Sequence, residues 1–329
     1  MTSPSMVFIG GVGRSGTSVT RQAMGLHPDV MTFPFEYRFL IDPDGIIDFV
    51  FGHQELWSPY LYDRKLKRLS ALLHRVSRKR FSEQLFSKML KYLAKAGLHY
   101  SQAQYLNWEL EKHFTGFRDA INNYLKKLSQ FSYRGYWIGV PSYQSDYQIN
   151  YVAPDHQQIV QITREFLSDL FIGLLDENQK STLVEDNTWN LLYCQQLLTL
   201  FPSARFIHVH RDPRDVVCSY LKQNWMPSDL AEAATICRDL YQRIFQTTAT
   251  LNSSQFRQIS LGHLVTDYAT VMGQLLDFCN LPHSVGMQNL TMDDSVLGIW
   301  KKQLTEQQQH WLTNFFQFEL NHLGYLNDN

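Results

Sequence analysis

The chain opens with a short apolar run that leads directly into a glycine-rich loop. Residues 6–9 read MVFI, and residues 10–18 read GGVGRSGTS. A continuous apolar run that ends in glycines is typical of a parallel strand buried on both faces. Val19, Ala23 and Leu26 follow at helical spacing, and we expect Thr17 or a neighbour to cap that helix. The chain therefore begins as strand, loop and helix.

The loop fits three kinds of phosphate site. As G-x-G-x-x-G it is a dinucleotide fingerprint, with Glu36 twenty positions past the last glycine. As G-x-x-x-x-G it is a nucleotide-triphosphate P-loop in which Thr17 replaces the lysine. As Arg14–Ser18 it is a binding loop for a phosphosulfate, because hydroxyls and a guanidinium fork supply hydrogen-bond donors in addition to the loop amides.

Composition restricts the class of protein. The 329 residues are 44% hydrophobic, and 30 basic side chains balance 31 acidic ones, so charge gives no reason to expect nucleic acid or an anionic membrane as partner. No apolar run approaches the length of a membrane span. We therefore expect a soluble, cytoplasmic protein without a metal site. Four widely spaced cysteines are expected to be buried thiols: Cys194, Cys218, Cys237 and Cys279.

Alternating strands and helices return in the second half of the chain. Leu183–Val184 and Arg205–His210 are predicted strands, Asn190–Leu200 is the predicted helix between them, and Pro213 suits the first turn of the next helix. Val30–Phe35 is a further apolar run and a predicted strand, which completes a β-loop-α-β opening. The pattern predicts an α/β fold, a three-layer, P-loop-like parallel sheet flanked by helices, with a large helical insertion.

We expect one domain over residues 1–329, with a helical insertion at 60–150. Residues 63–80 form a basic amphipathic pattern, which is more often a solvated helix face than a docking surface. Its apolar stripe comprises Leu66, Leu69, Leu73 and Val76. A final helix is expected at Gln307–Leu323, with an apolar stripe of Leu312, Phe316, Leu320 and Leu323.

A second anion site is suggested about two hundred residues after the loop, by the segment FIHVHRDPRDVVCSY. Arg211 follows a predicted strand, and Ser219 lies eight residues later. A guanidinium and a hydroxyl that converge on a phosphate monoester make strong charge-assisted bonds. An alternative interpretation is a surface ion-pair cluster of Arg211, Asp212, Arg214 and Asp215.

Together these segments resemble the sulfotransferases that use 3′-phosphoadenosine 5′-phosphosulfate (PAPS), in particular the branch that includes tyrosylprotein, carbohydrate and bacterial enzymes. The resemblance implies PAPS as co-substrate, no metal, Glu36 as general base and Arg14 as a catalytic cation. The positions that it implies for donor binding are Gly13, Arg14, Ser15, Gly16, Thr17, Ser18, Arg211, Ser219, Ser295, Trp300 and Lys301.

Two positions are weaker candidates for the substrate side, Arg38 and Asp186. Arg38 stands where the branch also has an arginine. Asp186 stands where many members have the lysine of an E-K-T-P segment, so a basic group is missing from the segment EDNT. Two alternatives stay open at this point, a P-loop kinase and a sulfotransferase-like module that binds nucleotide without turnover.

The acceptor of the sulfuryl group is expected to bear a hydroxyl, in a carbohydrate, a lipid headgroup, a phenol or a peptide. We expect the insertion at 60–150 to be the acceptor-binding region. Aromatic side chains suit rings and sugar faces without choosing among these. Those noted in the expected insertion are Tyr100, Tyr105, Trp108, Tyr133, Tyr136 and Trp137.

Overall fold

The computed structural model describes residues 4–54, 56–78, 109–136, 147–153, 155–284 and 294–326. Tyr37–Asn178 form one compact unit, and Ser5–Glu36 with Gln179–Asn329 form the other. The expectation of one domain with an insertion at 60–150 stays a prediction.

A five-stranded parallel sheet forms the centre of the second unit, in the order β2-β5-β1-β6-β7. Its strands are β1 (Ser5–Gly10), β2 (Val30–Thr32), β5 (Thr182–Glu185), β6 (Arg205–His210) and β7 (Phe256–Ser260). The central strand β1 pairs with β5 on one side and with β6 on the other. The loop after β1 therefore lies at the carboxyl edge of the sheet, between two neighbouring strand ends.

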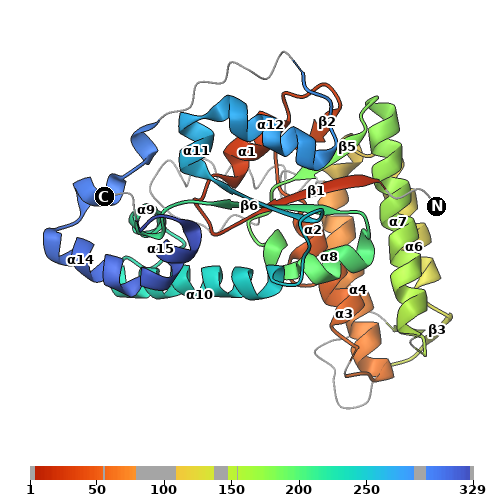
Figure 1. The fold of residues 1–329 in the computed structure, drawn as a ribbon. Helices are drawn as coiled ribbons and strands as arrows, with labels where there is room; N and C mark the ends of the chain where they lie inside the picture. The colour runs from red at the N-terminus through yellow and green to blue at the C-terminus, as the bar shows by residue number, and fades with distance from the viewer. Residues whose placement is uncertain are drawn as a thin grey trace, which may run out of the picture. The chain divides into compact units, whose positions relative to one another are not determined.

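Helices cover both faces of this sheet (Figure 1). On one face lie α1 (Thr17–Met24), α11 (Leu261–Thr266) and α12 (Tyr268–Cys279), whose buried side chains share a core with the sheet. The opposite face carries η4 (Asn190–Tyr193), α8 (Cys194–Leu200) and α10 (Leu230–Thr248). There Phe8 of β1 stacks on Phe206 of β6 at 5.6 Å between ring centroids. The predicted three-layer α/β fold is confirmed.

The remaining helices of this unit follow β6 or close the chain. They are α9 (Pro213–Tyr220), η6 (Asp294–Val296), α13 (Ile299–Gln303), α14 (Glu306–Phe315) and α15 (Gln317–Leu323). Pro213 occupies the first turn of α9, as predicted. The apolar stripe predicted near the C-terminus is buried, with Leu312, Phe316 and Leu320 fully enclosed.

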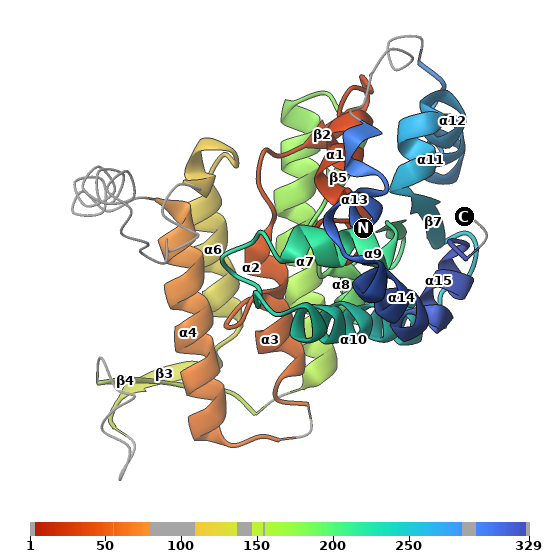
Figure 2. The ribbon, with the colours of Figure 1, turned by 90° about the vertical axis from the view of Figure 1, so that its left-hand side faces the viewer.

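The first unit is mainly helical (Figure 2). Its elements are α2 (Arg38–Ile41), α3 (Ile46–Phe51), α4 (Pro59–Ser77), η2 (Leu110–Lys112), α6 (Phe117–Lys127), the antiparallel strands β3 (Phe131–Arg134) and β4 (Gln148–Tyr151), and α7 (His156–Glu177). Aromatic rings fill its core. Tyr124 of α6 stacks on Phe166 of α7 at 4.3 Å, and the buried Tyr62 hydroxyl of α4 donates to the Leu128 carbonyl at 2.8 Å.

Several predicted elements differ in their ends. The predicted strand Val30–Phe35 stops at Thr32, and the predicted helix Asn190–Leu200 begins with a 3-10 turn. The predicted helix Gln307–Leu323 breaks at Phe316, where α14 ends and α15 begins. The basic pattern at 63–80 lies on α4, where its leucine stripe is buried as predicted, and residues 79–80 lie outside the described residues.

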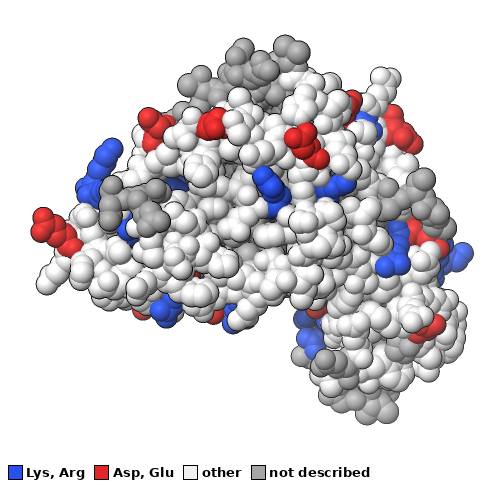
Figure 3. Space-filling view, viewed as in Figure 1, with Lys and Arg blue, Asp and Glu red and all other residues white. Residues whose placement is uncertain are grey.

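The four cysteines are free and buried, as predicted. Among the described residues no helix is long and apolar enough to cross a membrane. Acidic and basic side chains are scattered over a mostly uncharged surface on the face shown in Figure 3, in keeping with the balanced charge of the sequence.

Candidate active site

The glycine-rich loop joins the carboxyl end of β1 to the first turn of α1. The residue before the helix is Gly16, in the left-handed region at φ 106°, and no side chain caps the helix. The expected cap by Thr17 or a neighbour is therefore wrong. Gly16 is required because of its positive φ and because a Cβ there would lie 2.7 Å from a methyl group of Leu261. The uncapped end leaves backbone amides of the first turn available to an anion.

Ser15 is the best enclosed polar side chain of the loop. It is fully buried, and its Oγ has no hydrogen-bond partner among the described residues. A buried hydroxyl without a partner costs free energy unless a ligand or water supplies one. Thr17 is also buried, whereas Ser18 is exposed. Ser15 therefore fits a site whose occupant accepts hydrogen bonds.

The two segments predicted as anion sites meet. Nε of Arg14 donates to Oγ of Ser219 at 3.1 Å, across 205 residues of sequence. Nη1 of Arg211 donates to the Arg14 carbonyl at 3.3 Å. Arg14 itself adopts φ 69° and is exposed. Two guanidinium groups, a hydroxyl and the loop are thus assembled at one edge of the sheet.

The charged residues after β6 form buried ion pairs. Asp212 is paired with Arg214 at 2.7 Å, and Nε of Arg211 lies 3.8 Å from an Asp215 oxygen. All four residues are at most 9% exposed, so the interpretation as a surface cluster is wrong. Burial lowers the pKa of Arg211 and raises that of Asp215. An additional anion beside Arg211 would offset the cost of burying its charge.

Asp215 also holds the segment that contains three of the predicted donor residues. Its carboxylate accepts hydrogen bonds from the backbone amides of Gly298 at 2.8 Å and Trp300 at 3.0 Å. Nη2 of Arg211 donates to the carbonyl of Val296 in the same segment. These bonds tie the start of α13 to the segment after β6.

The donor residues predicted in that segment differ in exposure. Trp300 is 8% exposed and lies beneath the guanidinium of Arg214, 3.8 Å from the ring centroid. Ser295 and Lys301 are exposed, and Nζ of Lys301 lies 5.5 Å from the Trp300 ring centroid. Trp300 thus packs the segment, while Ser295 and Lys301 are accessible from solvent.

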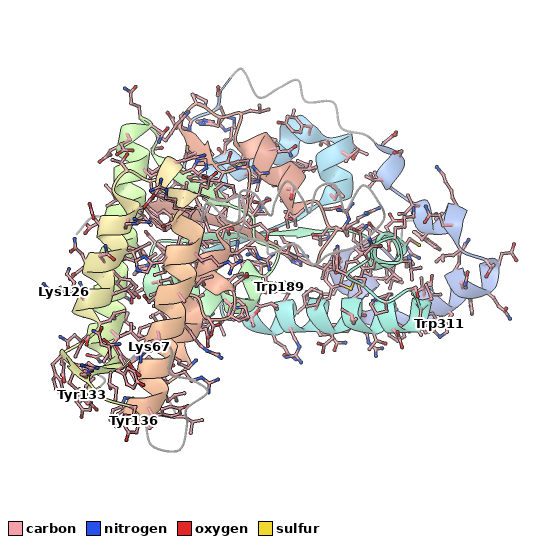
Figure 4. The ribbon with its side chains drawn as sticks, turned by 180° about the vertical axis from the view of Figure 1, so that it is seen from behind. Lys67, Lys126, Tyr133, Tyr136, Trp189 and Trp311 are labelled. Atoms are coloured by element: carbon pink, nitrogen blue, oxygen red, sulfur yellow. The ribbon has the colours of Figure 1, made fainter. Side chains whose placement is uncertain are left out.

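The segment after β5 lies beside the loop, because the amide of Gly11 donates to the carbonyl of Thr188 at 3.1 Å. Asp186 is buried and forms an ion pair with Arg21 of α1, at 2.9 Å. The side-chain oxygen of Asn187 accepts the amide of Trp189, which fixes the orientation of the Asn187 carboxamide. Its Nδ2 is buried and has no hydrogen-bond partner among the described residues. Trp189 is 41% exposed (Figure 4).

Glu36 ends the segment Ser5–Glu36 of the second unit, four residues after β2, and it is partly buried. Arg38 belongs to the first unit, where its Nε donates to both carboxylate oxygens of Asp42 at 3.1 and 3.0 Å. The substrate role expected of Arg38 stays a prediction.

Two of the aromatic residues considered for the acceptor are described. Tyr133 and Tyr136 are 44% and 64% exposed, at and just after β3 (Figure 4). The other four residues lie outside the described residues: Tyr100, Tyr105, Trp108 and Trp137. In the part of the chain that the structure describes, no cluster of histidine, cysteine and acidic residues could hold a metal ion.

Sequence reasoning did not find Arg21, Asn187 or the role of Asp215. Asp215 had a local signal, since it lies four residues after Arg211 on a predicted helix, where the two side chains share a face. Arg21 and Asn187 had no such signal, because their partners and their burial depend on how the strands align.

Solved structures of sulfotransferases resemble this fold. A sulfotransferase domain from the curacin biosynthetic pathway is 15% identical, with a TM-score of 0.50 over 97% of this chain and 99% of that one. The sulfotransferase domain from the Synechococcus PCC 7002 olefin synthase is 14% identical, with a TM-score of 0.49 over 97% and 96% of the two chains. At 15% identity the likeness to the curacin domain concerns the fold alone.

No curated protein matches the sequence. Residues 4–284 match the profile described as "Sulfotransferase family". Because this match covers most of the chain, the chain belongs to the sulfotransferase family.

Proposed function

We propose that this sulfotransferase moves the sulfuryl group of PAPS to a hydroxyl acceptor, with Glu36 as general base. The main observation behind the proposal is the contact between Arg14 and Ser219, which joins the two anion-binding segments at the carboxyl edge of the sheet. Ligands of open α/β sheets bind at this edge. A donor with phosphate groups at both the 5′ and 3′ positions suits two such segments.

The chain offers matching groups for such a donor. The amides of the uncapped α1 terminus and the buried Ser15 hydroxyl suit the 5′-phosphosulfate, with Gly13, Gly16, Thr17 and Ser18 shaping the loop. Arg211 and Ser219 suit the 3′-phosphate, which ATP lacks. Ser295, Trp300 and Lys301 belong to the segment that Asp215 fixes beside Arg211.

The reaction needs an acceptor oxygen, the sulfur and the leaving phosphate oxygen in line. Glu36 takes the proton of the acceptor hydroxyl while that oxygen bonds to sulfur, and the bond from sulfur to the 5′-phosphate oxygen breaks with its electron pair. General-base catalysis of this kind contributes about 10²–10⁴ in rate. Arg14 and the loop amides stabilise negative charge on the sulfuryl oxygens and the departing phosphate.

Ligand-dependent thermal stability tests the donor class. Addition of 3′,5′-adenosine bisphosphate is expected to raise the melting temperature, with stabilisation of about 2.7 kcal/mol at a hundredfold excess over Kd. ATP with magnesium and NAD serve as comparison ligands. Stabilisation by either of these, with none from the bisphosphate, would contradict PAPS as donor and favour the kinase or dinucleotide interpretation.

Substitution of the general base tests the chemistry separately. Glu36→Gln is expected to lower the transfer of radiolabelled sulfate from PAPS about 10²-fold or more, because the amide cannot take a proton. Bisphosphate binding should stay at the wild-type level. Full activity in this variant would remove Glu36 from the role of base, and a wild-type chain that binds bisphosphate without turnover would indicate a binding module. A panel of sugars, phenols, lipids and peptides then identifies the acceptor.

A further inference from the structure

Arg21 connects three parts of the candidate site. It lies on α1, the helix that begins at the glycine-rich loop. Its Nε lies 2.9 Å from Oδ1 of Asp186, and its Nη1 donates to the backbone carbonyl of Phe33 at 2.5 Å. The two charged side chains are only 12% and 3% exposed. One guanidinium thus holds both a carboxylate and a carbonyl away from bulk solvent.

These two contacts lie where the ladder between β2 and β5 stops. The last paired residues are Thr32 and Val184, after which Phe33 continues one strand and Glu185 and Asp186 continue the other. Because the strands are parallel, both continuations leave from the carboxyl edge, where the glycine-rich loop also begins. Arg21 therefore joins two strand ends beyond their last backbone pairing.

The pair explains why an acid can occupy position 186. A buried carboxylate needs a partner, and Arg21 provides a positive charge from the adjacent helix. Nε of Arg21 forms no well-aligned hydrogen bond, so the link to Asp186 is an ion pair, whereas the link to Phe33 is a hydrogen bond. The carboxylate orients the guanidinium, and the guanidinium holds the carbonyl.

The held carbonyl lies three residues before Glu36. Phe33 is 2% exposed and its ring contacts that of Phe35 at 5.4 Å, so its side chain and its carbonyl are both fixed. We propose that Arg21, oriented by Asp186, is a positioning residue that places the segment of Glu36 for proton transfer. This inference rests on the proposed function. Its physical basis is that a misplacement of about 1 Å costs about 10²-fold in rate.

The test separates turnover from donor binding in the purified full chain. Turnover is measured as release of radiolabelled sulfate from PAPS to water, and binding as the Kd of 3′,5′-adenosine bisphosphate by calorimetry. Arg21→Lys keeps a positive charge but lacks the planar fork of the guanidinium, so it cannot hold both links in the wild-type geometry. We expect turnover to fall about 10- to 100-fold while Kd stays within about twofold. Turnover and Kd that both match wild type, or a loss of turnover accompanied by an equally large rise in Kd, would overturn the inference.

Asp186→Lys distinguishes this inference from a simple loss of a catalytic lysine. If position 186 merely lacks a basic group, the substitution raises turnover and the inference is overturned. If Asp186 orients Arg21, the substitution places two cations together and turnover falls. The exposed pair Arg243 and Asp239 on α10, 2.8 Å apart, provides matched controls, because Arg243→Lys and Asp239→Lys should leave turnover unchanged.

An apolar double variant keeps the test decisive if the single variants unfold. Arg21→Met with Asp186→Leu replaces the buried ion pair by apolar side chains of similar size, which is often neutral for stability, and leaves no N–H donor for the Phe33 carbonyl. We expect a folded chain with wild-type Kd and low turnover. Wild-type turnover in this double variant would show that the carbonyl link is irrelevant. A wild-type chain that neither binds bisphosphate nor releases sulfate would instead refute the proposed function.

Discussion

Two glycines of the loop have different surroundings, and this difference separates a folding role from a binding role. A Cβ on Gly11 would lie 2.3 Å from the carbonyl oxygen of Val209 and 2.7 Å from Oγ of Ser15. A Cβ on Gly13 would lie 3.2 Å from a ring carbon of Trp225, which is 60% exposed and able to move. That Cβ would also lie 3.3 Å from the hydroxyl of the buried Tyr220, a tight contact with a side chain. The Cβ on Gly11 would instead overlap backbone, which cannot move aside, so Gly11 is the more strictly required of the two.

Gly11→Ala is therefore expected to destabilise the chain by about 2–4 kcal/mol, through a clash with backbone in the buried end of β6. Gly13→Ala is the matched control and should cost about 1 kcal/mol or less. Urea unfolding of both variants measures the difference. Equal stabilities would contradict the close approach of β1 and β6 at this loop.

Asn187 is a residue-scale candidate for donor binding. Its carboxamide oxygen is occupied by the Trp189 amide, while its buried Nδ2 has no partner among the described residues. Asn187→Asp replaces this nitrogen by a charged oxygen and leaves the acceptor in place. We expect the Kd of 3′,5′-adenosine bisphosphate to rise about tenfold or more. The control is Asn252→Asp in an exposed turn, and equal Kd values in the two variants would exclude contact between Asn187 and the donor.

At the scale of elements, Asp215 links α9 to α13. Because its carboxylate accepts two backbone amides at the start of α13, the position of that short helix depends on one side chain. Hydrogen bonds to a charged group contribute about 1.5–3 kcal/mol each, more than a five-residue helix can supply by itself.

Asp215→Asn presents an NH₂ group to one of these two backbone amides. That amide is then expected to lose its hydrogen bond. If the segment of Ser295 and Lys301 binds the donor, the Kd of the bisphosphate should rise about 10- to 100-fold. Hydrogen exchange at the amides of Gly298 and Trp300 should become faster. Asp239→Asn on the exposed face of α10 serves as control. Faster exchange without weaker binding would remove this segment from the donor site.

The elements that could be predicted are those whose signals are local. The strand at β6, the proline at the start of α9 and the strand–loop–helix at the beginning follow from apolar runs, glycines and proline. The split at Phe316 and the early end of β2 could not be predicted, because their apolar patterns continue while the backbone turns to pack the ring or to leave the sheet. In the site, the residue types of the loop were visible in the sequence. The meeting of Arg14 with Ser219 required the sheet order.

At the scale of the whole molecule, buried histidines are present in both units. Burial lowers the pKa of His53 in the first unit to about 4, and burial also lowers that of His210 in the second unit to about 4. Burial also holds the pKa of His208 well below its ordinary value. These side chains stay neutral in the folded chain at a pH where the unfolded chain binds protons.

Through these histidines, acid lowers the stability of the folded chain. Between the ordinary histidine pKa and about pH 4 the unfolded state binds more protons, so the free energy of unfolding falls as the pH falls. For His53, which is 3% exposed and packs edge-on against Phe49 and Tyr62, the loss is about 1–3 kcal/mol.

His53→Phe removes this titration and keeps an aromatic ring in the same environment. Urea unfolding at about pH 7 and about pH 5 should show a smaller acid-induced loss of stability in His53→Phe than in wild type. His310→Gln, at an exposed histidine of α14, is the control. The same acid-induced loss in wild type and His53→Phe would mean that His53 is not held neutral by burial.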